Sequence, residues 1–161
     1  MDLPLTFRPT MWDDAVHRIC LSWEGTPYRL NGCVKKGGVD CLHFAAAVLD
    51  ELYGSEHSKE LKSLPTDACI HNKVGVMVAA RALFERYPVE RITEGIVESG
   101  DLVLLGRSDQ LDTTQHLLVA GWRGMLWHAD SPRVHATGMN APPHLKLVCV
   151  YRAEDKENWV C

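Results

Sequence analysis

Apolar residues in the first third of the chain recur at the spacing of an α-helix. In Met11–Trp23 they lie three or four positions apart, and Thr10 and Asp13 occupy the two positions of a capping box at the helix start. The stretch from Cys41 to about Leu52 is apolar at nearly every position, and Gly54 follows it. These patterns predict an amphipathic first helix and a second helix that is buried on nearly all sides.

Two segments lack a strong period. The stretch Gly25–Asp40 holds four glycines and a proline, which predicts irregular backbone up to Asp40. Between Ser55 and Ser99 the pattern is weak, apart from an amphipathic helix predicted over 72–87, which Pro88 ends and a linker follows.

After Gly100 the pattern changes to that of β-strands. Short apolar or alternating runs cover 101–105, 115–120, 125–129 and 145–152, and Gly, Asp, Ser and Pro separate them. Helices followed by strands predict an α+β fold, with N-terminal helices packed on a C-terminal antiparallel sheet. No repeat or interdomain linker is evident, so residues 1–161 are predicted to form a single domain.

Composition excludes several classes of protein. Of the 161 residues 46% are hydrophobic and 24% charged, the net charge is −4, and no basic tract occurs. These values argue against disorder and against nucleic acid or an anionic membrane as a partner. No run reaches the roughly 18 apolar residues of a membrane span.

The N-terminus lacks the basic start and apolar core of a signal peptide. We therefore expect a protein that is soluble and cytoplasmic as synthesised. The six cysteines include no CxxC pair, so we expect reduced thiols and neither a disulfide framework nor a zinc ribbon.

Candidate chemistry begins at Asp40 and Cys41. Asp40 is placed to cap the second helix, and Cys41 then lies at the positive end of the helix dipole, which favours a thiolate. The residues alone leave two interpretations: a nucleophile, or a small buried hydrophobe that starts a core helix.

A nucleophilic cysteine needs a base. His116 and His128 fall on neighbouring predicted strands, and an odd number of residues in the connecting loop would place both on one face of the sheet. His116 would then act as the base and His128 would orient it, with a lowered cysteine pKa and a raised histidine pKa. Taken singly, each histidine is equally compatible with an ordinary surface or core imidazole.

Other polar residues near Cys41 complete the hypothesis. The backbone N–H of Cys41 and the hydroxyl of Tyr28 are candidate oxyanion donors. His43 lies two residues after Cys41, so the two side chains diverge around the helix. A zinc site from Cys33, Cys41, His116 and His128 has suitable ligand types but not the paired spacing of zinc motifs. The remaining histidines are predicted to be solvated: His17, His57, His71, His135 and His144.

An ordered set of short motifs resembles the NlpC/P60 cysteine peptidases. After Trp23 they are Gly-Thr-Pro-Tyr at 25–28, Gly-Gly-Val-Asp-Cys at 37–41, Leu-Tyr-Gly at 52–54, Gly-Asp-Leu-Val at 100–103, Gln-His at 115–116 and Trp-His-Ala at 127–129. The chain is most similar to the phage-tail and gene-transfer-agent branch, in which Leu follows the cysteine and the helix ends in Tyr-Gly.

The resemblance implies a papain-like fold and hydrolysis of an amide bond in peptidoglycan stem peptides, commonly between D-glutamate and a diamino acid. It implies a catalytic set of Cys41, His116 and His128, and Tyr28 corresponds to the active-site tyrosine of the family. It implies no metal or organic cofactor. The expected partners are the stem peptide and phage tail proteins, and delivery to a virion or the periplasm would need a tail, a lysis system or a secretion machine.

Two departures from the family pattern bear on function. His43 stands where the family has a small residue, which affects the shape of the substrate groove and makes His43, with Asp40, a candidate substrate-binding residue. The long interval between Cys41 and His116 predicts an insertion at 55–99. Two alternatives stay open: an inactive phage-tail assembly protein, and a related thiol amidohydrolase or acyltransferase with a substrate outside the wall.

Overall fold

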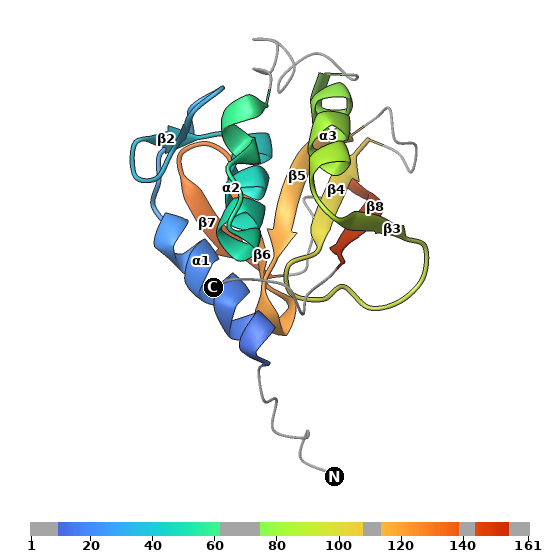
Figure 1. The fold of residues 1–161 in the computed structure, drawn as a ribbon. Helices are drawn as coiled ribbons and strands as arrows, with labels where there is room; N and C mark the ends of the chain where they lie inside the picture. The colour runs from blue at the N-terminus through green and yellow to red at the C-terminus, as the bar shows by residue number, and fades with distance from the viewer. Residues whose placement is uncertain (1–9, 62–74, 108–113, 139–143, 155–161) are drawn as a thin grey trace.

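The computed structural model describes residues 10–61, 75–107, 114–138 and 144–154 (Figure 1). Its helices are α1 (Met11–Trp23), α2 (Cys41–Tyr53) and α3 (Gly75–Arg86), with short 3-10 turns η1 (His57–Glu60) and η3 (Trp122–Gly124). No helix in these ranges is both long and apolar enough to cross a membrane.

A six-stranded antiparallel sheet forms the second layer, in the spatial order β3-β8-β4-β5-β6-β7. In chain order its strands are β3 (Val89–Ile92), β4 (Leu102–Gly106), β5 (Thr114–Ala120), β6 (Leu126–Ala129), β7 (Val134–Thr137) and β8 (Lys146–Ala153). A separate small hairpin pairs β1 (Cys33–Val34) with β2 (Gly38–Val39) just before α2.

Helix α2 is the centre of the core. It contacts α1 and α3 on the helix side and packs on β5 and β6 of the sheet, as Figure 1 shows. Leu42 and Leu49 are fully buried on one side of the helix, and Phe44, two positions after Leu42, is fully buried on another. The α+β arrangement of N-terminal helices on a C-terminal antiparallel sheet, predicted from the hydrophobic pattern, is therefore confirmed.

Most predicted elements occur where the pattern placed them. Helix α1 has the predicted bounds, and Thr10 and Asp13 form the capping box. Helix α2 ends at Gly54, which adopts the left-handed conformation (φ 68°) that suits glycine. Helix α3 lies within the predicted 72–87, of which 72–74 fall outside the described residues. The four predicted strands shift by at most one residue at either end.

Two strands of the large sheet and one small hairpin were not predicted. The glycine-rich loop forms the β1-β2 hairpin, so the expectation of irregular backbone up to Asp40 was wrong there. Position 32 requires a glycine, because a Cβ there would lie only 2.6 Å from the carbonyl oxygen of Gly38. Strands β3 and β7 are four residues long each and follow prolines, and their pairing with distant strands holds them in place.

The segment 55–99 contributes to the core where the structure describes it. Helix α3 packs on α2 and β5, and Leu83 and Tyr87 are buried. Strand β3 extends the sheet beside β8. That 55–99 is an insertion relative to other proteins, and that 1–161 is one domain of this kind, stay predictions.

The buried carboxylate of Asp50 ties α2 to this segment. It accepts hydrogen bonds from the hydroxyls of Ser55 (2.6 Å) and Tyr87 (2.7 Å) and from the backbone N–H groups of His57 (3.0 Å) and Ser58 (2.9 Å). Burial raises the pKa of Asp50, but these hydrogen bonds outweigh it and hold the pKa below its ordinary value. His57, predicted to be solvated, lies half-buried and edge-on to Tyr87.

Replacement of Asp50 by alanine should destabilise the fold by about 3 kcal/mol at pH 7, because buried donors lose a charged acceptor. Urea unfolding measures this difference, and Asp14→Ala on the exposed side of α1 is the control. The folded pKa is lowered, so the stabilisation is present above the unfolded pKa of about 3.9 and is lost as the pH falls through the folded value. If the difference in free energy of unfolding between wild type and Asp50→Ala did not shrink in acid, the stabilisation would not come from the ionised carboxylate of Asp50.

Candidate active site

The start of helix α2 is fixed by the carboxylate of Asp40. This residue is fully buried, and its Oδ1 accepts the backbone N–H of His43 at 2.9 Å while its Oδ2 accepts the N–H of Asn31 at 2.7 Å. Cys41 is thereby held as the first residue of α2, 2% exposed, at the positive end of the helix dipole. That position favours the thiolate form of a cysteine.

His43 completes the surroundings of Asp40. Its Nδ1 lies 2.8 Å from Oδ1 of Asp40, and the residue is only 4% exposed. A third donor thus satisfies the buried carboxylate, as a buried charge requires. Through Nδ1 the imidazole therefore bonds back to the residue that caps its own helix. Contacts of Asp40 and His43 with a substrate stay predictions.

The segment Gly25–Tyr28 links the helix start to the strands. The N–H groups of Gly25 and Tyr28 donate to the carbonyls of Val134 (2.9 Å) and Pro132 (3.0 Å), beside the start of β7. On its other side, Tyr28 forms an isolated β-bridge with Val39, two residues before Cys41. The backbone therefore places Tyr28, which is half-buried, beside Val39 in the strand that leads to Cys41. The role of Tyr28 as an oxyanion donor stays a prediction.

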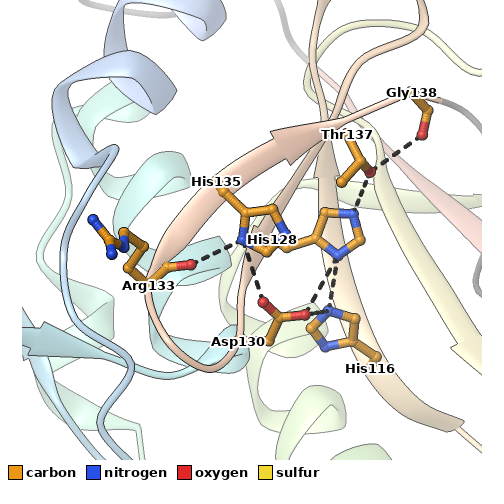
Figure 2. A network of polar contacts seen from close by, with 7 residues as sticks. All are labelled: His116, His128, Asp130, Arg133, His135, Thr137 and Gly138. Atoms are coloured by element: carbon orange, nitrogen blue, oxygen red, sulfur yellow. Dashed lines mark hydrogen bonds and ion pairs between the residues drawn. The ribbon is translucent and has the colours of Figure 1, made fainter.

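His116 and His128 lie on the same face of the sheet. The register of β5 and β6 pairs Ala120 with Leu126, which leaves an odd loop of five residues, 121–125. The predicted parity is confirmed, with the two histidines diagonal to one another in this register. The pairing of β4 with β5 shifts at this point, because Leu105 pairs with His116 while Gly106 pairs with Thr114. The shift adds a bulge to β5 beside His116. Nε2 of His116 lies 3.2 Å from Nδ1 of His128 (Figure 2).

Thr137 of β7 sets the direction of this contact. Its Oγ1 lies 2.7 Å from Nε2 of His128 and 3.2 Å from the carbonyl oxygen of Gly138. We assign the hydroxyl proton to the carbonyl, which makes Oγ1 the acceptor of a proton from Nε2 of His128. Nδ1 of His128 is then unprotonated and accepts the N–H of His116 Nε2. With this assignment Nδ1 of His116 is unprotonated, on the strand against which the helix of Cys41 packs. The contacts then form a chain from Thr137 through His128 to His116.

The surroundings of both imidazoles lower their pKa values and so favour the neutral form. Burial, followed by the charges of His128 and His135, lowers the pKa of His116 to about 3. Burial and His135 likewise lower the pKa of His128 to about 4. The expectation of a raised histidine pKa is therefore wrong for this state. His116 would act as a neutral base that takes the thiol proton at the moment of attack.

Two further residues surround the pair and were missed in the sequence. Asp130 Oδ2 lies 3.9 Å from both His116 Nε2 and His128 Nδ1. His135, predicted to be solvated, stacks on His128 with 5.1 Å between ring centroids. Asp130 was detectable, because it follows His128 by two positions and so shares its face. His135 and Thr137 were not detectable from the sequence, because β7, the strand that carries them, was not predicted.

The four-residue zinc site considered from the sequence does not form. The thiol of Cys33 is hydrogen-bonded to Ser58. Among the described residues, the group whose ligand atoms lie close together is instead His116, His128 and Asp130. Cys33 and its neighbours 29–34, 37 and 38 line a pocket of about 510 Å³ in the loop that leads to Cys41.

Comparison of the sequence with protein-family models finds no matching family, and comparison with curated proteins finds no relative. Solved structures do match the fold. RipD from Mycobacterium tuberculosis, described as a non-catalytic NlpC/p60 domain protein adapted to peptidoglycan binding, matches with a TM-score of 0.52 at 13% identity, over 89% of this chain and 98% of that one.

Two other structures extend the match. An NlpC/P60 family protein from Bacillus cereus has a TM-score of 0.57 at 18% identity, over 90% of this chain and 41% of its own. The peptidoglycan hydrolase RipB from Mycobacterium tuberculosis matches with a TM-score of 0.51 at 15% identity, over 89% of this chain and 65% of its own. This chain thus spans less than two thirds of these two proteins. It has the papain-like NlpC/P60 fold that the motifs predicted, and the phage-tail branch stays a prediction.

The role of Thr137 as a positioning residue is testable by substitution. Thr137→Val keeps the shape of the side chain but removes the acceptor of the His128 proton, so the proton should redistribute between Nδ1 and Nε2 of His128. ¹⁵N NMR of the imidazoles measures this tautomer ratio. Thr137→Ser retains the hydroxyl and should retain the wild-type spectrum. Wild-type tautomers in the valine variant would show that Thr137 does not set the proton positions.

Proposed function

We propose that this chain is a thiol hydrolase that cleaves an amide bond in peptidoglycan stem peptides, of the D-glutamyl-diamino acid type, with Cys41 as nucleophile. The observation that supports it most is the chain from Thr137 through His128 to His116. With the His116 proton on Nε2, this chain leaves Nδ1 unprotonated and able to accept a thiol proton, on a strand packed against the helix that Cys41 begins.

Each group in the proposed reaction has a defined task. Nδ1 of His116 takes the proton of Cys41, and the thiolate attacks the scissile carbonyl carbon. The backbone N–H of Cys41 and the hydroxyl of Tyr28 receive the developing oxyanion. The imidazolium of His116 then protonates the leaving amine, and water attacks the thioester with His116 again as base. His128 and Thr137 keep the ring of His116 oriented throughout.

The substrate class is supported by the comparisons and by the loop before α2. RipB is described as a peptidoglycan hydrolase and RipD as adapted to peptidoglycan binding. The pocket lined by residues of 29–38 lies in the loop that leads to α2, and we propose that an extended peptide approaches Cys41 along this loop. Association with a phage tail, and a cytoplasmic origin with later delivery to the wall, are parts of the proposal that these observations do not bear on.

A non-catalytic role is the main alternative, because RipD is described as such a protein on the same fold. The directed proton chain favours the hydrolase, since binding alone does not require an unprotonated Nδ1 at His116. A related acyltransferase would use the same groups, and only the acceptor of the acyl group would differ.

The decisive experiment is digestion of defined muropeptides with product analysis by mass spectrometry. Cys41→Ala should lower the rate of fragment release by about 10³ or more, because no other group replaces the nucleophile. Reaction in H₂¹⁸O should place one label in the released carboxylate if water is the acceptor, whereas a transferase would give an unlabelled adduct.

The matched control removes a different thiol. Cys149 is buried on β8, a strand that does not carry the site, so Cys149→Ala should keep its activity once unfolding curves confirm a folded protein. Unchanged fragment release by Cys41→Ala would refute the hydrolase mechanism. A wild-type protein that binds muropeptides without cleaving them would favour the RipD-like role.

A further inference from the structure

Three ligand atoms converge beside the proton chain. Nε2 of His116, Nδ1 of His128 and Oδ2 of Asp130 are separated by 3.2, 3.9 and 3.9 Å, and Figure 2 shows them facing a common point. They come from β5, the end of β6 and the residue just after β6. Strands therefore hold the two histidines, and Asp130 follows directly after the end of β6.

The spacing suits a transition metal. The centre of a triangle with these sides lies about 2.1 Å from each corner, which is the length of zinc bonds to imidazole nitrogen and carboxylate oxygen. Two imidazoles and one carboxylate also form a ligand set that zinc commonly takes with an open fourth position. No cysteine of the described residues belongs to the group, so that position is available to water.

The carboxylate of Asp130 supplies a second, independent observation. Its Oδ1 is buried and has no hydrogen-bond partner among the described residues, although Nδ1 of His135 lies 3.3 Å away. That nitrogen is 2.9 Å from the carbonyl of Arg133, which takes its proton. The Asp130 side chain as a whole is 44% exposed, but the buried Oδ1 lies beside imidazoles without a hydrogen bond and is poorly satisfied by protein groups alone.

The far nitrogen of His128 is also held as in a metal site. Metal-bound histidines usually donate their other ring N–H to an oxygen acceptor, which fixes the ring. His128 makes this contact with Thr137 while its Nδ1 faces the other two ligands. The same hydrogen bond would thus serve both the proton chain and a metal.

We propose that His116, His128 and Asp130 form a site for a zinc ion, and that the zinc-bound protein is unable to use Cys41 as a nucleophile. Zinc takes the lone pair of His116 Nε2, so the ring proton must lie on Nδ1. His116 then has no lone pair for the thiol proton. The inhibitory part of this inference rests on the proposed hydrolase function, whereas metal binding itself does not.

Calorimetric titration of the full chain with zinc chloride tests the site directly. One zinc ion should bind per chain, and Asp130→Asn should weaken its affinity at least about tenfold while keeping the size of the side chain. Asp14→Asn on the exposed face of α1 is the matched control and should bind as wild type does. Cobalt(II) absorption in the visible range reports whether the coordination is tetrahedral.

Cys41→Ala separates this site from binding by the thiol. It should retain zinc affinity, because the three ligands are intact. Loss of binding in Cys41→Ala, equal binding by wild type and Asp130→Asn, or no binding by wild type would each overturn the site. In the muropeptide assay, zinc should inhibit wild type over the range in which it binds, and a chelator should restore the rate. If no hydrolysis were found, the titrations would still decide whether the metal site exists.

Discussion

The buried carboxylate of Asp40 is the contact on which the rest of the site depends. It is stable in the core only because donors from both sides surround it, the N–H of Asn31 from the loop and two groups of His43 from the helix. Loop and helix are therefore joined at the residue before Cys41. The segment Gly25–Tyr28 then pairs with the backbone at 132–134, beyond the end of β6. These contacts therefore hold the start of α2, with Cys41, against the segment that connects the strands of His128 and His135.

Features that depend on neighbours in sequence were predictable. A capping box at Thr10, the Asp40 cap and the Gly54 terminator each involve residues within one helical turn, so the spacing of side chains reveals them. The common face of His116 and His128 was also predictable, because hairpin parity depends only on loop length. Apolar runs likewise indicated the four strands with a buried face.

Features that depend on distant pairing were not predictable. Strand β3 exists because β8 offers it an edge, and β7 because β6 does, and neither four-residue segment has a period of its own. Thr137 and His135 belong to β7, so their contacts with His128 had no local signal. The lowered pKa of His116 has the same origin, since burial and two imidazoles from other strands produce it. Sequence motifs identified Cys41 and His116 as candidates for nucleophile and base, and tertiary structure added the groups that surround His116.

The facing nitrogen atoms of His116 and His128 can either share a hydrogen bond or bind a metal ion together. A hydrogen bond needs one proton between Nε2 of His116 and Nδ1 of His128, whereas a metal needs none there. Thr137 fixes the His128 proton on Nε2 in either case, so the choice concerns the His116 proton alone. With the proton on Nε2, Nδ1 of His116 is available as the proposed base for Cys41. With the proton on Nδ1, Nε2 of His116 is available as the proposed metal ligand. In the proposed metal-bound state Asp130 adds the third ligand, because its carboxylate faces the two nitrogens without accepting a hydrogen bond from either. The position of one proton therefore separates a thiol-activating site from a metal-binding one.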